Sequence, residues 1–146
     1  MEVHHIGYLV RDMEIAMKKL SALGFLPPPR KTRNYERGVD VCFVQNGSYT
    51  VELISPFRDD SDVSGLIKKC RNMIYHICYI SYDLKKDMEE LKKEGFVPVS
   101  KITKAPSIAG SDVVFLYNSS IGMIELVKLN VQKEITNHEG KTVNSI

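Results

Sequence analysis

Two short segments with the composition of strands are each followed by a segment in which apolar residues recur at helical intervals. Residues 3–10 and 74–82 are rich in β-branched and aromatic residues, which is typical of strands. The helical spacing begins after Asp12 and again after Asp83. Each aspartate can accept hydrogen bonds from the first free N–H groups of a helix. The pattern therefore predicts a strand and then a helix at two places in the chain.

Three further strands are predicted after each helix, once the helices end at Gly24 and Gly95. These strands lie near residues 30–36, 39–46 and 49–55 in the first half, and near 97–104, 112–118 and 122–129 in the second. A short helix is predicted near residues 63–70, in the connector between the halves. Each half therefore has the predicted order βαβββ.

The two halves also repeat each other in sequence. Residues 5–25 and 76–96 align without gaps at an offset of 71. The identical pairs are His5/His76, Ile6/Ile77, Tyr8/Tyr79, Asp12/Asp83, Met17/Met88, Leu20/Leu91, Gly24/Gly95 and Phe25/Phe96. The similarity continues in residues 40–43 against 112–115, and in 51–54 against 124–127. A repeat of this length favours a duplicated structural unit.

The repeat predicts an α+β fold of two tandem βαβββ modules. We expect the modules to form a curved, mostly antiparallel sheet around a cleft, with the helices on the outside. The modules span about residues 3–56 and 74–129 and are joined by the connector 57–73, as a single domain over residues 1–130. Residues 131–146 form a polar tail without clear periodicity.

Composition excludes several classes of protein. A formal net charge of +2 does not favour a nucleic-acid or membrane-surface partner. No apolar run approaches the roughly 20 residues that span a bilayer, and no secretory signal is expected at the N-terminus. The three cysteines form no CxxC pair, which predicts a reducing, cytoplasmic compartment. Cys42 and Cys78 lie in predicted strands and are expected to be buried and inert.

The repeated residues include one histidine and one glutamate in each half. Because side chains alternate across a strand, His5 can face the cleft from the first strand of its module, and Glu52 from the last. His76 and Glu125 occupy the equivalent positions of the second module. A pseudo-two-fold arrangement would bring all four side chains together.

Two imidazoles and two carboxylates in one enclosed place form a plausible metal site. Unpaired buried carboxylates cost several kcal/mol each, and a divalent cation removes that cost. This ligand set suits Ni, Co, Zn, Mn or Fe better than Ca or Cu(I). His4 is expected on the opposite face of its strand, and its equivalent in the second module is Tyr75. Neither His4 nor His138, in the tail, is assigned a role.

The paired modules, each with a first-strand histidine and a last-strand glutamate, resemble the vicinal oxygen chelate superfamily over about residues 3–128. Its members include glyoxalase I, methylmalonyl-CoA epimerase, extradiol dioxygenases and bleomycin-resistance proteins. The chain is most similar to the epimerase and glyoxalase I-like branch. The stretches that carry this similarity are His4-His5-Ile6-Gly7, Glu36-Arg37-Gly38-Val39, Val51-Glu52-Leu53-Ile54-Ser55-Pro56, Ser61-Asp62-Val63-Ser64-Gly65-Leu66-Ile67, Tyr75-His76-Ile77-Cys78 and Val114-Phe115-Leu116.

The resemblance implies that His5, Glu52, His76 and Glu125 hold one divalent metal ion. It also implies a homodimer and a small-molecule carbonyl or thioester substrate, whose α-proton is removed and whose enolate is stabilised. Glu125 is the first candidate for the base and Glu52 the symmetric alternative. The implied enzyme is an epimerase or isomerase, or a lyase of the lactoylglutathione type, and the substrate is left open between a coenzyme A thioester and a glutathione hemithioacetal.

The sequence also departs from the epimerase pattern. The epimerase has a second catalytic glutamate on the strand before the one that carries Glu52, but residues 40–43 contain none. Asp40 lies nearby, and its repeat equivalent Asp112 favours a structural role for both. Five basic residues in equivalent strands could meet a substrate phosphate or form a solvated surface. They are Arg30, Lys31, Arg33, Lys101 and Lys104.

Two other functions fit the same superfamily. The first is a non-catalytic protein that sequesters a small molecule or antibiotic; such members generally lack the metal ligands. The second is a non-haem iron extradiol dioxygenase, whose chemistry needs two histidines and one carboxylate with open positions. A fourth ligand, Glu52, would crowd that site.

Overall fold

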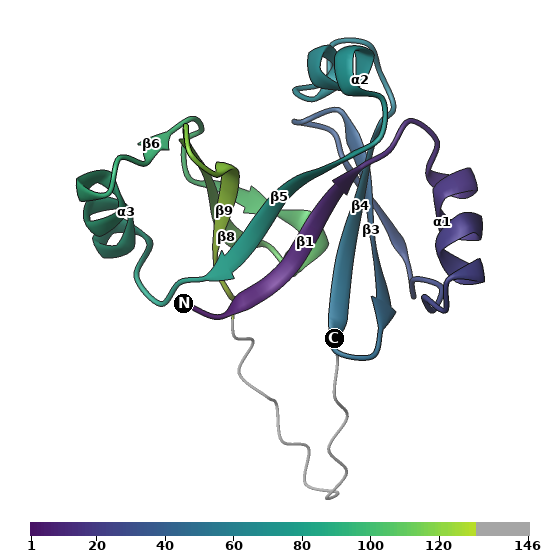
Figure 1. Ribbon diagram of the computed structural model, residues 1–146, viewed down its shortest axis with the longest axis horizontal. Coiled ribbons are helices and arrows are strands. Elements are labelled where there is room, and N and C mark those ends of the chain that lie inside the picture. The colour runs from purple at the N-terminus through teal and green to yellow at the C-terminus, as the bar shows by residue number, and fades with distance from the viewer. Residues whose placement is uncertain (131–146) are drawn as a thin grey trace, which may run out of the picture.

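The computed structural model describes residues 1–130, which form one curved sheet flanked by helices (Figure 1). The first half contains β1 (Val3–Leu9), α1 (Met13–Ala22), β2 (Lys31–Asn34), β3 (Val39–Asn46) and β4 (Tyr49–Pro56). The connector contains α2 (Ser64–Cys70). The second half contains β5 (Met73–Ile80), α3 (Leu84–Lys93), β6 (Val97–Pro98), β7 (Thr103–Ala105), the 3-10 helix η1 (Pro106–Ile108), β8 (Ser111–Asn118) and β9 (Gly122–Lys128).

The strand order shows the duplication directly. It runs β2-β3-β4-β1-β5-β9-β8-β6 across the sheet, and β7 pairs with β8 beside this path. Within the halves, β1 runs parallel to β4, and β5 runs parallel to β9. The two halves meet where β1 and β5 pair antiparallel, so their first strands lie at the centre of the sheet. The remaining pairings are antiparallel, which confirms the predicted fold class.

Local capping begins the two long helices where the sequence indicates. The Asp12 carboxylate accepts a hydrogen bond from the Ile15 N–H at 2.9 Å, and the Asp83 carboxylate accepts one from the Lys86 N–H at 3.1 Å. Each bond satisfies a backbone donor that has no partner within its helix. The helices α1 and α3 therefore start at equivalent points and pack on the outside at the two ends of the sheet (Figure 1).

The alternation of side chains divides the core between the two faces of the sheet. On the outer face, Val10 and Leu53 pack with Met13 of α1, and Leu126 packs with Leu84 of α3. On the inner face, the residues packed together beneath α2 are Leu9, Val39, Val41, Ile54, Val63 and Ile67. The face that carries His5 and Leu9 is thus the inner face, as the alternation predicts.

The structure differs from the predicted strands in one region of the second half. The single strand expected near 97–104 is two short strands, β6 and β7. Pro98 has no N–H to donate to the ladder. Between the two strands, Ser100 accepts the Phe115 N–H through its hydroxyl at 2.9 Å, in place of a backbone carbonyl. The 3-10 helix η1 that follows β7 was not predicted.

Two β-bulges interrupt the pairing of β1 with β5 and correct the prediction for His4. The paired residues on either side of the bulges are Val3–Tyr79, His5–Cys78, Gly7–His76 and Tyr8–Ile74. This register leaves His4 as an extra residue on β1 and Tyr75 as an extra residue on β5. A bulge re-aims the side chain that it carries. The prediction that His4 lies on the face opposite His5 is therefore wrong, and its ring contacts that of His5.

Candidate metal centre

The four side chains singled out in the sequence come together at the middle of the sheet, all from one chain. His5 lies on β1 and His76 on β5, the two central strands, while Glu52 and Glu125 lie on the neighbouring strands β4 and β9. Their ligand atoms all lie within 4.8 Å of one another. All four residues are buried, with exposed fractions of 1–4%.

The distances between these atoms are short and nearly equal. His5 Nε2 lies 3.2 Å from Glu52 Oε2 and 3.3 Å from Glu125 Oε2. His76 Nε2 lies 3.5 Å from Glu52 Oε2 and 3.2 Å from Glu125 Oε2. The two Nε2 atoms are themselves 3.2 Å apart. Two atoms that each bind one cation at about 2.1 Å are about 3.0 Å apart at a right angle and about 3.4 Å apart at the tetrahedral angle. The observed separations match those of ligands around a single ion.

One buried oxygen in this cluster supports the same interpretation. Glu125 Oε2 is inaccessible to solvent and makes no aligned hydrogen bond, although it lies near two imidazole nitrogens. A buried carboxylate oxygen without a partner is costly. Two imidazole nitrogens and two carboxylate oxygens form a donor set suited to a divalent transition metal ion. The residues present therefore fit such an ion.

The charges within the cluster shift the pKa values of two of its members. Burial lowers the pKa of His5, but the adjacent carboxylates of Glu125 and Glu52 outweigh burial and raise that pKa to about 9. Burial raises the pKa of Glu125, but His5 and His76 outweigh it and hold that pKa well below its usual range. Glu125 is therefore an ionised carboxylate at neutral pH.

Aromatic rings enclose both imidazoles in the same way. Phe43 on β3 meets the His5 ring edge-to-face at 5.3 Å between centroids, and Phe115 on β8 meets the His76 ring at 5.2 Å. Each phenylalanine pairs across the ladder with the glutamate of its own half. Neither ring was predicted to belong to the site, although both lie in the repeated stretches. They shield the cluster from water and strengthen its electrostatic interactions.

Gly7 is a second residue of the site that the sequence analysis did not single out. It pairs with His76 across the two central strands, and a side chain at this position would overlap the His76 ring. Glycine within a strand often marks a close approach of this kind, which was the available signal. Its repeat equivalent is Cys78, which pairs with His5.

The other candidate residues lie outside this cluster. Arg33 forms a two-pronged ion pair with Asp40 at 2.8 and 2.9 Å. Lys104 forms a single ion-pair contact with Asp112 at 2.8 Å. The Arg33 guanidinium holds the pKa of Asp40 below its usual range. Lys31 pairs with Glu14 at 3.2 Å.

The remaining candidate residues lie at the surface, in the core or outside residues 1–130. Arg30 and Lys101 are exposed. Cys42 and Cys78 are buried as expected, and burial raises the pKa of both thiols. His138 lies outside the described residues.

A family model described as the Glyoxalase/Bleomycin resistance protein/Dioxygenase superfamily matches residues 4–115. The mitochondrial methylmalonyl-CoA epimerase of Bos taurus is 32% identical over 132 residues, which cover 87% of this chain and 72% of the relative. Among solved structures, methylmalonyl-CoA epimerase from Mycobacterium tuberculosis matches with a TM-score of 0.76 at 19% identity, covering 88% of both chains. An epimerase in complex with methylmalonyl-CoA and NH4+ also matches at 0.76, with 23% identity and coverage of 89% and 95%.

The fold, the site and these matches define a vicinal-oxygen-chelate protein built from two equivalent modules, in the second of which the strand after the helix is divided into β6 and β7. The chain belongs to the glyoxalase/bleomycin resistance/dioxygenase superfamily. Within it, the relatives named above are methylmalonyl-CoA epimerases, which are isomerases. Among the described residues, no helix is long and apolar enough to cross a membrane. The cytoplasmic location and the homodimer stay predictions.

Proposed function

We propose that this chain is a metal-dependent epimerase that inverts the carbon next to the carbonyl of a coenzyme A thioester. The observation that carries the proposal is the convergence of His5, Glu52, His76 and Glu125, whose ligand atoms all lie within 4.8 Å of one another. Each imidazole nitrogen lies 3.2–3.5 Å from both carboxylates and 3.2 Å from the other imidazole nitrogen. The names of the relatives support a substrate of the methylmalonyl-CoA type. A divalent cation held by these four side chains would supply Lewis-acid stabilisation of negative charge on the carbonyl oxygen.

Glu125 is the proposed base. Its carboxylate is ionised at neutral pH, as a general base must be before it accepts a proton. It takes the proton from the carbon α to the carbonyl, and the electron pair of the broken C–H bond passes into the carbonyl group as an enolate. Return of a proton to the opposite face of the carbon inverts its configuration. Glu125, protonated by the first step, is the proposed donor of that proton, and Glu52, the equivalent carboxylate of the other module, is the alternative base.

The enclosure of the cluster supports this chemistry. Phe43 and Phe115 pack against the two imidazoles, and the four polar side chains are almost completely buried. Exclusion of water strengthens the electrostatic interactions that stabilise an enolate. The same site could act on a glutathione hemithioacetal, with the proton returned to the neighbouring carbon, so the substrate must be tested directly.

The test is exchange of the α-proton of methylmalonyl-CoA in D2O, followed by NMR. Protein reconstituted separately with Zn2+, Co2+ or Ni2+ is expected to bind one ion per chain and to catalyse the exchange. Glu125→Gln is expected to slow exchange by about 10²–10⁴-fold, the usual contribution of a general base. Glu89→Gln, at an exposed position on α3, is the matched control and should keep full activity.

Metal content measured for Glu52→Gln and Glu125→Gln separates loss of the ion from loss of the base. Metal-loaded wild type that exchanges no α-proton across a panel of coenzyme A thioesters would contradict the proposal. Turnover of a glutathione hemithioacetal in that situation would point to lyase chemistry at the same residues.

A further inference from the structure

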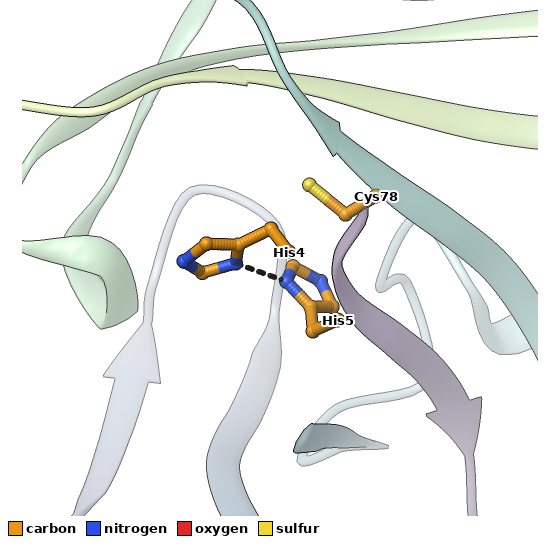
Figure 2. Close-up of side chains that lie close together, drawn as sticks. All are labelled: His4, His5 and Cys78. Atoms are coloured by element: carbon orange, nitrogen blue, oxygen red, sulfur yellow. Dashed lines mark hydrogen bonds between the residues drawn. The ribbon is translucent and has the colours of Figure 1, made fainter. Parts of the chain in front are cut away.

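His4 lies beside the metal centre because of the bulge in β1. Its Nδ1 is 2.7 Å from Nδ1 of His5, and the two rings meet edge-to-face at 5.0 Å between centroids (Figure 2). His4 also contacts the ring of Phe43, at 6.5 Å between centroids. The neighbouring imidazole therefore reaches His5 from the side opposite the cluster.

Cation binding through Nε2 of His5 decides which histidine donates in this bond. His5 Nε2 points at the two carboxylates and must keep a free lone pair to bind a cation. The proton of a neutral His5 then belongs on Nδ1, where His4 Nδ1 is the acceptor at 2.7 Å. A bond of this length holds both the tautomer and the orientation of the His5 ring.

The second module lacks the equivalent bond. Nδ1 of His76 is buried and has no hydrogen-bond partner. The bulge residue beside it is Tyr75, which meets the His76 ring at 5.0 Å, as His4 meets His5, but forms no bond to this nitrogen. The two imidazoles thus occupy equivalent positions, but only His5 has a hydrogen-bond partner at Nδ1.

We propose that His4 is a positioning residue that orients His5 for metal binding, so that His5 is the better-organised of the two imidazole ligands. This inference rests on the proposed function, because it concerns the same metal centre. Partners that bond the outer nitrogen of a ligand histidine typically change metal affinity by about 10–100-fold. Loss of the His4 hydrogen bond is expected to weaken metal binding to this extent.

A second cation held by His4, His5 and Cys78 is the competing interpretation. Their ligand atoms lie within 4.8 Å of one another, and Figure 2 shows the thiol beside the two rings. Such a site would require His5 to bind metal through both nitrogens and to give up both protons. Cys78 is fully buried and packs with the apolar side chains of Val113 and Val127. The hydrogen bond is therefore the simpler account of the 2.7 Å contact.

The experiment compares the Zn2+ affinity of three variants by competition with a chromophoric chelator. His4→Phe keeps a ring at this position but removes the acceptor nitrogen, and it is expected to weaken Zn2+ binding about 10–100-fold. His4→Asn offers a side-chain oxygen near the position of Nδ1 and should restore most of the affinity. Tyr75→Phe is the matched control in the other module and should bind as the wild type does.

A second measurement reports the bond without a cation. In metal-free protein with ¹⁵N-labelled histidine, a ¹⁵N–¹⁵N coupling across the hydrogen bond is expected between the two Nδ1 atoms and should vanish in His4→Phe. Wild-type affinity in His4→Phe would overturn the proposal, and so would two Zn2+ ions per chain with one lost in both His4→Phe and Cys78→Ser. Wild type that binds no Zn2+ would instead contradict the proposed function. If such protein still shows the coupling, the hydrogen bond between His4 and His5 exists and only the metal site is wrong.

Discussion

Gly7 has no side chain and so leaves space for the imidazole of His76, a candidate metal-binding group. It pairs with His76 across β1 and β5, and the imidazole occupies the space where a Cβ would lie. The atoms that a Cβ would meet belong to the ring itself, so a larger residue at position 7 must displace the ring from the cluster. The requirement here is space, because Gly7 has no positive φ angle.

We expect Gly7→Ala to lower the affinity for Zn2+ at least about 10-fold, which is the loss found when the contacts that orient a metal-binding side chain are removed. The reason is displacement of His76 Nε2 from the other three ligand atoms. Chelator competition measures the affinity, and circular dichroism checks the fold. Gly65→Ala is the matched control, since nothing lies near a Cβ at that position in α2 and alanine favours a helix. Unchanged affinity in Gly7→Ala would contradict the assigned role of His76.

The helices depend on capping bonds that a short sequence motif can specify. Asp12 and Asp83 are repeat equivalents, and each accepts the N–H three residues further on. Asp83 is the simpler one to test because α3 has exposed charges over most of its surface and packs on β9 through few apolar residues. The cap therefore contributes a measurable share of its local stability.

For the helix α3, we expect Asp83→Ala to lower the free energy of unfolding by about 1 kcal/mol. Urea denaturation followed by circular dichroism measures the change. Asp83→Asn keeps a side-chain oxygen that can accept the Lys86 N–H and should lose much less. Equal losses in the two variants would show that the carboxylate charge, and not the hydrogen bond, stabilises the helix.

Across the whole molecule, the cluster of two histidines and two glutamates lies where the two halves meet. One histidine and one glutamate come from each half, and the antiparallel pairing of β1 with β5 holds the halves together. In the absence of metal, the charged form of His5 beside Glu125 and Glu52 takes part in that cohesion. Folding and protonation are therefore linked through this residue.

The sign of this linkage follows from the raised pKa. His5 has a pKa of about 9 in the folded protein, against 6.5 as its ordinary value. The stability that it contributes is fully present below pH 6.5 and is lost as the pH rises towards 9. We expect the unfolding free energy of the metal-free protein to fall across this range. Urea denaturation with a chelator present measures it, and His5→Gln should flatten the dependence. An equally steep fall in His5→Gln would assign the effect to other groups.

Much of the site could be predicted because the alternation of side chains is a local property of a strand, and the repeat produces the same alternation in both halves. Alternation along a strand placed His5 and Glu52 on one face, and the repeat placed His76 and Glu125 in equivalent positions. Hydrophobic spacing and aspartate caps located the helices for the same reason, since both are properties of neighbouring residues. The strand near 97–104 was predicted less well, because Pro98 and Ser100 interrupt its pairing with β8.

The chain by itself determined the duplicated order of elements and the kinds of side chain that meet. Only the tertiary structure decided that His4 turns towards His5, that Gly7 lies under His76, and that Phe43 and Phe115 enclose the rings. The physical reason is that these features arise from the pairing of β1 with β5 and from contacts between distant strands. A one-residue bulge reverses the face of a side chain, and strand alternation read along a single segment does not register it.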